Sequence, residues 1–180
     1  MSGVELKLVK ADGTRAGQGE EGEVRAKAPQ MMLGYLDGAL DAEAFDDHGY
    51  FRTGDLGLLN ERNMLTITGR LKDVIIRKGE NVSAKEVEDH LFTHPQVRDV
   101  AVIGLPDERS GERVVAIVST PEGQDPLTFA AMVEFLRGEG LMIIKVPEQL
   151  EVIDSIPRNP AGKILKQDLR KQFEGSSPNR

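Results

Sequence analysis

The sequence predicts an α+β fold in which a strand-rich first part is followed by a part where strands and helices alternate. Near the start, apolar and polar residues alternate over Val4–Val9, as they do in a half-buried strand. From residue 74 on, short apolar runs alternate with helical stretches, an order typical of a sheet covered by helices. A capping box with Ser83 as N-cap and Glu86 at the third helical position marks the first of these helices.

The first part extends to about residue 70 and consists mainly of strands and turns. Its expected elements are a turn at Ala11–Thr14, a partner strand at Gly22–Ala26, a short helix at Ala42–Phe45, and a hairpin of Leu56–Leu59 with Met64–Thr68. These strands carry few apolar residues and offer only a thin core. We therefore interpret this part as a subdomain of something larger.

The second part supplies the rest of the fold. Its expected elements are strands at Val74–Ile76 and Glu80–Val82 around Gly79, a helix from Ser83 to about Thr93, strands at Val97–Leu105 and Glu112–Thr120, a helix at Pro126–Arg137, an extended segment at Leu150–Ile153 and a helix at Leu165–Phe173. Residues 175–180 are expected to be a disordered tail.

Composition narrows the class of protein. With 180 residues the chain is long enough to bury a core, and with no Cys it has neither disulfides nor a cysteine nucleophile. The net charge of −7 argues against general binding to nucleic acid or to an anionic membrane. We find no signal peptide and no apolar run long enough to span a bilayer, so a cytoplasmic protein is expected. His90 and His94 lack the Glu of a zincin helix, and no metal site is expected.

Three residues have side chains that suit a nucleotide ligand. A carboxylate such as Asp55 accepts hydrogen bonds from ribose hydroxyls, although an Asp after a glycine also fixes its own turn. Arg70, fifteen positions later, suits a ribose or phosphate but also an acidic neighbour. Lys163 follows Gly162 in a proline-rich segment that does not match a P-loop. Lys166, Arg170 and Lys171, further on, are expected to form a solvated helix face, and Asp46 is also expected to be solvated.

Three segments, taken in order and at their spacing, carry a resemblance to a known family. They are Tyr50–Asp55, Gly69–Asp73 and Pro157–Lys163. Together they resemble the C-terminal third of the adenylate-forming enzymes, which include acyl-CoA synthetases, firefly luciferase and the adenylation domains of peptide synthetases. The resemblance implies that residues 1–70 are the β-rich end of a large N-terminal AMP-binding domain. Residues 71–174 then correspond to the small C-terminal domain of the family.

The resemblance also implies roles for individual residues. Asp55 and Arg70 match the ribose-binding pair, and Lys72 matches the hinge residue on which the small domain swings. Lys78 and Gly79 lie where CoA-using members border the tunnel for the pantetheine arm. Lys163 matches the lysine that binds the substrate carboxylate and the α-phosphate during adenylation, where a cation stabilises developing charge.

The resemblance leaves two hypotheses about function. In the favoured one the chain is the C-terminal part of an acyl-CoA synthetase that activates a carboxylic, preferably fatty, acid with ATP and transfers it from an acyl-adenylate to CoA. The phosphate loop, the acyl pocket and the Mg²⁺ ligands have no counterpart in the chain, so it is expected to be inactive without an N-terminal AMP-binding domain. Alternatively, it is a free-standing, non-catalytic module that binds a nucleotide, CoA or a protein partner, or one subunit of a split ligase. A homodimer through an exposed apolar face of the first part is a further expectation.

Overall fold

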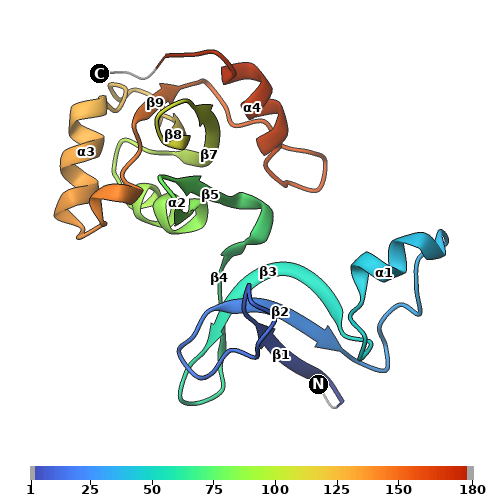
Figure 1. Cartoon of the computed structure of the whole chain (residues 1–180). Helices are drawn as coiled ribbons and strands as arrows, with labels where there is room; N and C mark the ends of the chain where they lie inside the picture. Colours follow the sequence, from blue (N-terminus) through green and yellow to red (C-terminus); the bar gives the residue numbers. More distant parts are fainter. Residues whose placement is uncertain (1–2, 178–180) are drawn as a thin grey trace. The chain divides into compact units, whose positions relative to one another are not determined.

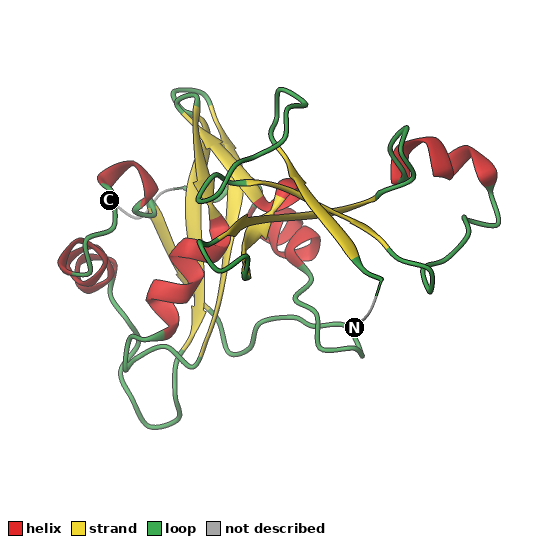
Figure 2. Cartoon of the chain, turned by 90° about the horizontal axis from the view of Figure 1, so that it is seen from below, coloured by secondary structure: helices red, strands yellow, loops and turns green. Residues whose placement is uncertain are grey.

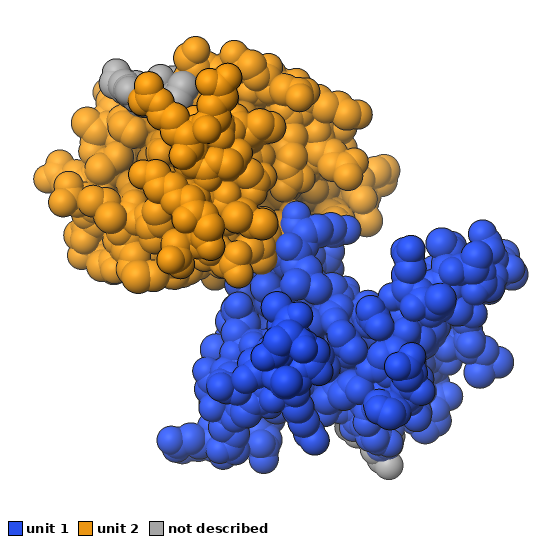
Figure 3. Space-filling view, in the orientation of Figure 1, with its two compact units in different colours: residues 1–72 blue, residues 73–180 orange. Residues whose placement is uncertain are grey.

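The structure is a computed structural model that describes residues 3–177. The chain divides into two compact units, of which the first ends at Lys72 and the second begins at Asp73 (Figure 3). The boundary expected from the sequence, after residue 70, lies two residues earlier. Among the described residues, no helix is long and apolar enough to cross a membrane.

The first unit is built on a four-stranded antiparallel sheet (Figure 1). In both chain and sheet order its strands are β1 (Glu5–Val9), β2 (Gly22–Lys27), β3 (Phe51–Leu59) and β4 (Leu65–Arg70). A 3-10 helix, η1 (Gly38–Leu40), and the short α1 (Asp41–Ala44) precede β3. The expected strands, hairpin and short helix are all present, but β3 begins at Phe51, five residues before the predicted strand.

The first unit has a small apolar core, as expected, and a network of ion pairs lies beside that core. Within residues 3–72, the buried apolar side chains are Leu8, Val9 and Val24. Beside them, Asp46 Oδ2 pairs with Lys7 Nζ at 2.7 Å and with Arg25 Nη1 at 3.2 Å. The expectation that Asp46 is solvated is therefore wrong. Its side chain is only 8% exposed, because the turn before β3 folds back onto the sheet.

The second unit has a five-stranded mixed sheet with helices on both faces (Figure 2). The 3-10 helix η2 (Leu71–Asp73) spans the boundary between the two units. The elements of the second unit that follow it are β5 (Val74–Arg77), β6 (Glu80–Ser83), α2 (Ala84–Phe92), β7 (Asp99–Asp107), β8 (Gly111–Ser119), α3 (Phe129–Gly138), η3 (Ile143–Lys145), β9 (Gln149–Val152) and α4 (Lys166–Phe173). The sheet order is β6-β5-β8-β7, and β9 pairs with β8 in parallel. The α+β prediction is confirmed.

Alternation along β7 and β8 gives the sheet two apolar faces. Val100 and Val102 pack with residues of α2 and α3, whereas Ala101 and Ile103 pack with Leu169 of α4. This period of two follows from the pleat, which sends successive side chains to opposite faces. The sheet is therefore buried on both sides, and the loop that leads into α4 runs along one of them.

Two helices of this unit begin at side-chain caps. Ser83 Oγ accepts the Glu86 N–H at 3.3 Å, which confirms the predicted N-cap of α2. Thr128 Oγ1 accepts the Ala131 N–H at 3.2 Å at the start of α3. α3 therefore begins at Phe129, three residues after the predicted start at Pro126, because the N-cap is Thr128, whose backbone is extended.

The segment after α4 differs from the predicted disordered tail. Arg113 Nη2 donates to Ser176 O at 2.6 Å, and Gln149 Nε2 donates to Ser176 Oγ at 2.7 Å. Arg113 and Gln149 are both buried, so these bonds attach Ser176 to the interior of the unit. Residues 178–180 lie outside the described residues.

Candidate functional site

Asp55 and Arg70, the predicted ribose-binding residues, lie opposite each other on β3 and β4. Arg70 Nε donates to Asp55 Oδ1 at 2.7 Å, and both side chains remain partly exposed. Arg70 therefore contacts an acidic neighbour, as the local reading of the sequence allowed. Among residues 3–177, Asp55 Oδ2 and the two terminal nitrogens of Arg70 have no partner. The pair consequently still offers one carboxylate oxygen and a guanidinium edge to a ligand.

A β-bulge determines where Asp55 points. The register shifts between β2 and β3 around Thr53–Asp55, and Gly54 within the shift has a φ of 71°. Thr53 Oγ1 donates to Val24 O at 2.7 Å and accepts the Asp55 N–H at 3.0 Å. The expected strand begins only at Leu56, after a turn that Asp55 would fix, whereas Asp55 lies inside β3. The turn-forming residues produce a bulge instead, and a bulge re-aims the side chains of its strand.

Lys72, the predicted hinge residue, is the last residue of the first unit and lies in η2. Its side chain is exposed and has no partner among the described residues. The next residue, Asp73, lies 3.8 Å from Arg170 Nη2 of α4 within the second unit. Lys72 is thus an unconstrained side chain at a boundary between units, which is compatible with a hinge but also with a surface lysine.

Lys78 and Gly79, the predicted CoA-binding residues, form the turn between β5 and β6. Both adopt positive φ angles, 53° and 80°, as a tight two-residue hairpin turn requires. The Lys78 N–H donates to Ser110 O at 2.7 Å, which ties the turn to the loop between β7 and β8. No atom lies within 4 Å of the position that a Cβ on Gly79 would occupy, so the glycine faces open space.

Arg77, next to this turn, is a buried cation whose partners the sequence did not predict. Its Nη1 donates to Ile144 O at 2.5 Å and to Val146 O at 3.0 Å, and its Nη2 pairs with Glu148 at 2.8 Å. These contacts attach the hairpin to η3 and to the segment that follows it. On the other side of Arg77, Glu112 Oε2 accepts the Ile76 N–H at 2.7 Å. The Lys78–Gly79 turn is therefore held from two sides.

Lys163, the predicted catalytic residue, lies in a closed loop of residues 157–165, which we call the lysine loop. Three backbone bonds close it: Asn159 N–H to Lys163 O, Gly162 N–H to Asn159 O, and Leu165 N–H to Pro157 O, at 2.8–2.9 Å. Asn159 Oδ1 also accepts the Lys163 N–H at 2.9 Å. The Lys163 side chain is exposed, and its ammonium group has no partner among residues 3–177. The loop thus fixes the backbone of Lys163 and leaves its charge available.

Cations flank Lys163 on both sides along the chain, and each is paired with an acid. Arg158 forms a two-nitrogen contact with Asp99, with Nη2 2.9 Å from both carboxylate oxygens. Lys166 Nζ lies 2.7 Å from Glu88 Oε1, and the Lys166 side chain is only 14% exposed. The expected solvated face is therefore wrong for Lys166, because α2 covers it. The acids lie far from Lys163 in the sequence, and spacing alone carries no signal of this pairing.

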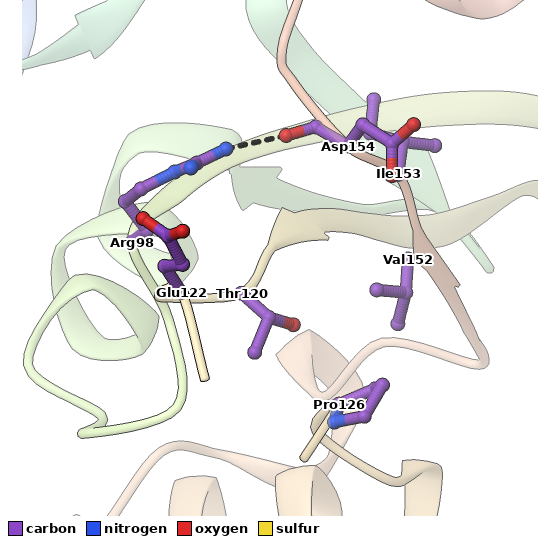
Figure 4. Close-up of a pocket in the computed structure, with 7 residues that line it drawn as sticks. All are labelled: Arg98, Thr120, Glu122, Pro126, Val152, Ile153 and Asp154. Atoms are coloured by element: carbon purple, nitrogen blue, oxygen red, sulfur yellow. Dashed lines mark hydrogen bonds between the residues drawn. The ribbon is translucent and has the colours of Figure 1, made fainter. Parts of the chain in front are cut away.

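The predicted site residues thus divide between the two units, and within the described residues the side-chain contact between two of them is that of Asp55 with Arg70. Asp55 and Arg70 share a sheet in the first unit, whereas Gly79 and Lys163 lie on different loops of the second. A pocket of the second unit is lined by none of these residues (Figure 4). Its lining residues are Arg98, Thr120, Glu122, Pro126, Val152, Ile153 and Asp154, and Arg98 donates to Asp154 O.

The candidate metal ligands within residues 3–177 are His, Asp and Glu side chains. No group of three or more His, Asp or Glu side chains there is arranged to hold an ion. His94 packs edge-on against Phe135 with ring centroids 4.7 Å apart, and its Nδ1 accepts the Gln96 N–H. Burial lowers the pKa of His94 below its usual value. His94 is therefore a packed side chain whose Nδ1 already accepts a hydrogen bond.

Comparisons with known proteins agree on one group of enzymes. Residues 86–163 match the AMP-binding enzyme C-terminal domain. The medium-chain fatty-acid–CoA ligase of Escherichia coli is 40% identical over 173 residues, and Triostin synthetase I of Streptomyces triostinicus is 42% identical over 167 residues. A crystal structure of ATP-bound MatB from Rhodopseudomonas palustris superposes with a TM-score of 0.89 at 34% identity, covering 97% of this chain.

The matched proteins are much longer than the chain. The alignments cover 96% and 92% of it but only 31% of each of the two curated relatives, and 35% of MatB. The chain therefore spans about a third of the length of these proteins.

Proposed function

The chain belongs to the adenylate-forming enzymes, and on that premise we propose that it supplies the C-terminal part of an acyl-CoA synthetase. Such an enzyme activates a carboxylic acid with ATP and passes the acyl group to CoA. The substrate carboxylate attacks the α-phosphorus of ATP and pyrophosphate leaves, which forms an acyl-adenylate. The CoA sulfur then attacks the acyl carbon and AMP leaves. A fatty acid is the preferred substrate class, and the E. coli relative at 40% identity bears the name of a fatty-acid–CoA ligase.

Lys163 carries this proposal. A free ammonium group on a rigid, exposed loop suits a transient anionic partner, because no internal ion pair has to break before that partner binds. In the adenylation step Lys163 would contact the substrate carboxylate and the α-phosphate, and would stabilise the charge that develops as the new bond forms. The observation behind this role is that four hydrogen bonds close the lysine loop, two of them to the backbone of Lys163, while the Lys163 side chain has no partner among residues 3–177.

Asp55 and Arg70 would hold the nucleotide. Asp55 Oδ2 is available to accept hydrogen bonds from the ribose hydroxyls, and the Arg70 terminal nitrogens are available to donate to ribose or phosphate oxygens. Their mutual contact at 2.7 Å orients both side chains before a ligand arrives. A preoriented pair loses less side-chain entropy on binding than two free side chains do.

The remaining residues would serve the second step. Lys78 and Gly79 would border the path of the pantetheine arm, and the open space beside Gly79 is compatible with close approach of a ligand. Lys72, at the boundary between the units, would be the hinge that allows the second unit to move between the two steps. Mg²⁺ would accompany ATP and neutralise its phosphate charge, with protein ligands contributed from outside these 180 residues.

Two alternatives remain: a non-catalytic module that binds nucleotide, CoA or a protein partner, and one subunit of a split ligase. Calorimetric titration of the 180-residue chain with a non-hydrolysable acyl-adenylate analogue, and separately with CoA, discriminates them from the main proposal. We expect no binding of either ligand by the chain alone. Micromolar binding that is lost in both Asp55→Ala and Arg70→Ala would favour the module. A separately encoded large subunit that copurifies would favour the split ligase.

The direct test uses a fusion protein in which the N-terminal part of the E. coli ligase, up to the segment that aligns with this chain, is followed by the 180-residue chain. We call this fusion protein the hybrid enzyme. Lys163→Ala should slow adenylation in it by about a hundredfold, the usual cost of removing one transition-state contact. Acid-dependent exchange of pyrophosphate into ATP measures this step. Lys171→Ala, which removes an exposed lysine of α4, is the matched control and should have no effect. An inactive unsubstituted hybrid, or equal activity of the two variants, would contradict the proposal.

A further inference from the structure

Glu88, on α2, contacts both the sheet and the helix that follows Lys163. Its Oε1 accepts the Val102 N–H at 2.8 Å and lies 2.7 Å from Lys166 Nζ. Val102 belongs to β7, the edge strand of the sheet, so its N–H has no neighbouring strand to pair with on that side. One carboxylate thus satisfies a buried edge N–H and attaches the first residue of α4 to the sheet. Both charged side chains are less than one-fifth exposed, which strengthens the ion pair relative to a surface pair.

Asp99 makes a comparable connection on the other side of Lys163. It begins β7, and both of its carboxylate oxygens contact Arg158. Arg158 also donates from Nη1 to Gly162 O at 2.7 Å, the carbonyl that directly precedes Lys163. A fork-shaped guanidinium in this position joins the edge strand to the tip of the lysine loop.

Glu88 and Asp99 therefore both connect the lysine loop or the residue after it to strand β7. The lysine loop is internally closed, so it behaves as a small rigid body whose position depends on how it is attached to the rest of the unit. Its attachments include one ion pair before Lys163 and one after it, and both reach β7, directly from Asp99 or through the Val102 N–H from Glu88. The chain at both ends of the loop already packs in the apolar core through Ile156 and Ile164, and the two ion pairs add fixed points that restrict how far the loop tip can tilt relative to β7.

We propose that Glu88 and Asp99 are positioning residues for Lys163, a proposal that rests on the role of Lys163 in adenylation given above. They do not touch the substrate; they hold the lysine loop so that the ammonium group of Lys163 is presented at a fixed place. A displacement of about 1 Å of a reacting group costs as much as a hundredfold in rate. Losing either attachment is therefore expected to slow adenylation. It should spare acyl transfer to CoA from supplied acyl-adenylate, a step in which Lys163 has no proposed part.

The first measurement uses the 180-residue chain and does not depend on any activity. In Glu88→Gln and in Asp99→Asn, the amides of Gly162, Lys163 and Leu165 should exchange with solvent at least about threefold faster than in the unsubstituted chain. Val115, in the centre of β8, is the reference amide and should not change. Asp89→Asn is the matched control, because Asp89 is the neighbouring acid on α2 and pairs with Lys85 in an exposed contact. Unchanged loop exchange in both test variants would overturn the proposal.

The second measurement uses the hybrid enzyme and separates this proposal from the proposed function. Glu88→Gln and Asp99→Asn should each lower the adenylation rate about tenfold and leave the rate from supplied acyl-adenylate unchanged, with Asp89→Asn normal in both assays. The double variant Glu88→Gln/Lys166→Met should lose no more than the larger single loss, as expected for one interacting pair. If Lys163→Ala lowers adenylation but the two test variants do not, the positioning role is wrong. If Lys163→Ala itself has no effect, the proposed function is wrong.

Discussion

Asp46 illustrates how a single carboxylate compensates for a thin apolar core in the first unit. Burial alone would raise the pKa of Asp46, but hydrogen bonds from Lys7, from the backbone N–H groups of Tyr50 and His48, and from Arg25 outweigh it. The pKa of this carboxyl consequently lies well below its usual range. Lys7 also lies over the Tyr50 ring, 4.2 Å from its centroid, so the same cation contributes to two contacts.

The pKa of Asp46 has a consequence for acid stability. A carboxyl whose pKa is lower in the folded than in the unfolded state stabilises the fold above the unfolded pKa, about 3.9 for Asp. That contribution is lost as the pH falls from about 4 toward the folded pKa. Asp46→Asn should therefore lower the free energy of unfolding at pH 7 by about 2 kcal/mol and flatten its decline below pH 4. Urea unfolding of the chain at a series of pH values measures both effects.

Asp47, the neighbouring exposed acid, provides the control for this prediction. Asp47→Asn removes the same charge one residue away and should leave the stability–pH curve unchanged. If the two variants behaved alike, net charge and not the Asp46 network would determine acid stability.

Among individual residues, sequence reasoning succeeded where the determinant was local and missed pairings between distant segments. The Ser83 cap depends on a residue three positions away, and the Gly79 turn depends on its own φ, so both were predictable. Lys166 was expected in solvent because the acid that covers it, Glu88, lies 78 positions earlier in the chain. Asp55 was expected in a turn because Gly54 and Asp55 favour turns locally, and pairing with β2 and β4 overrode that preference.

At the scale of elements, the β5–β6 hairpin shows how contacts from other segments hold a two-residue turn in place. Lys78 and Gly79 form the turn, and Arg77, Ser110 and Glu112 attach the hairpin to the rest of the unit. The strands of this hairpin were predicted correctly from alternation and from the glycine. Its attachments could not be predicted, because they join residues 32 to 71 positions apart.

Gly79→Ala separates the conformational need for this glycine from its proposed role beside CoA. An alanine at a φ of 80° costs about 1 kcal/mol of stability, and no further clash is expected because no atom lies within 4 Å of the new Cβ. If a CoA arm passes there, the added methyl group should also slow acyl transfer from supplied acyl-adenylate in the hybrid enzyme. Adenylation, measured by pyrophosphate exchange, should be unchanged.

Gly123 offers the matched control, since it has a φ of 78° and equally open surroundings in a loop of the same unit. Gly123→Ala should cost the same stability, read from the denaturant midpoint, and should leave both steps at their normal rates. Equal effects of the two variants on acyl transfer would attribute the requirement for Gly79 to backbone strain alone.

At the scale of the whole molecule, the first unit has exposed apolar side chains on the segment between β2 and α1. Leu33 and Leu36 are fully exposed, and Met32 and Tyr35 nearby are more than 40% exposed. Several large apolar side chains exposed on one short segment are typical of an interface. The relatives that share the fold are about three times as long as this chain, so the proposed N-terminal AMP-binding domain is the partner that we expect to cover it.

This expectation can be tested by binding in trans. The N-terminal part of the E. coli ligase, supplied separately, should bind the 180-residue chain, and Leu33→Asp combined with Leu36→Asp should weaken binding at least about tenfold, because each substitution places a charge in an apolar contact. Phe92→Asp, which alters a side chain 61% exposed on α2 of the second unit, should have little effect. Calorimetry measures the affinities, and sedimentation of the chain alone measures whether it pairs with itself. Equal affinity for the double variant and the unsubstituted chain would show that the segment is not the interface, whereas a homodimer that the double substitution dissociates would assign the surface to a second copy.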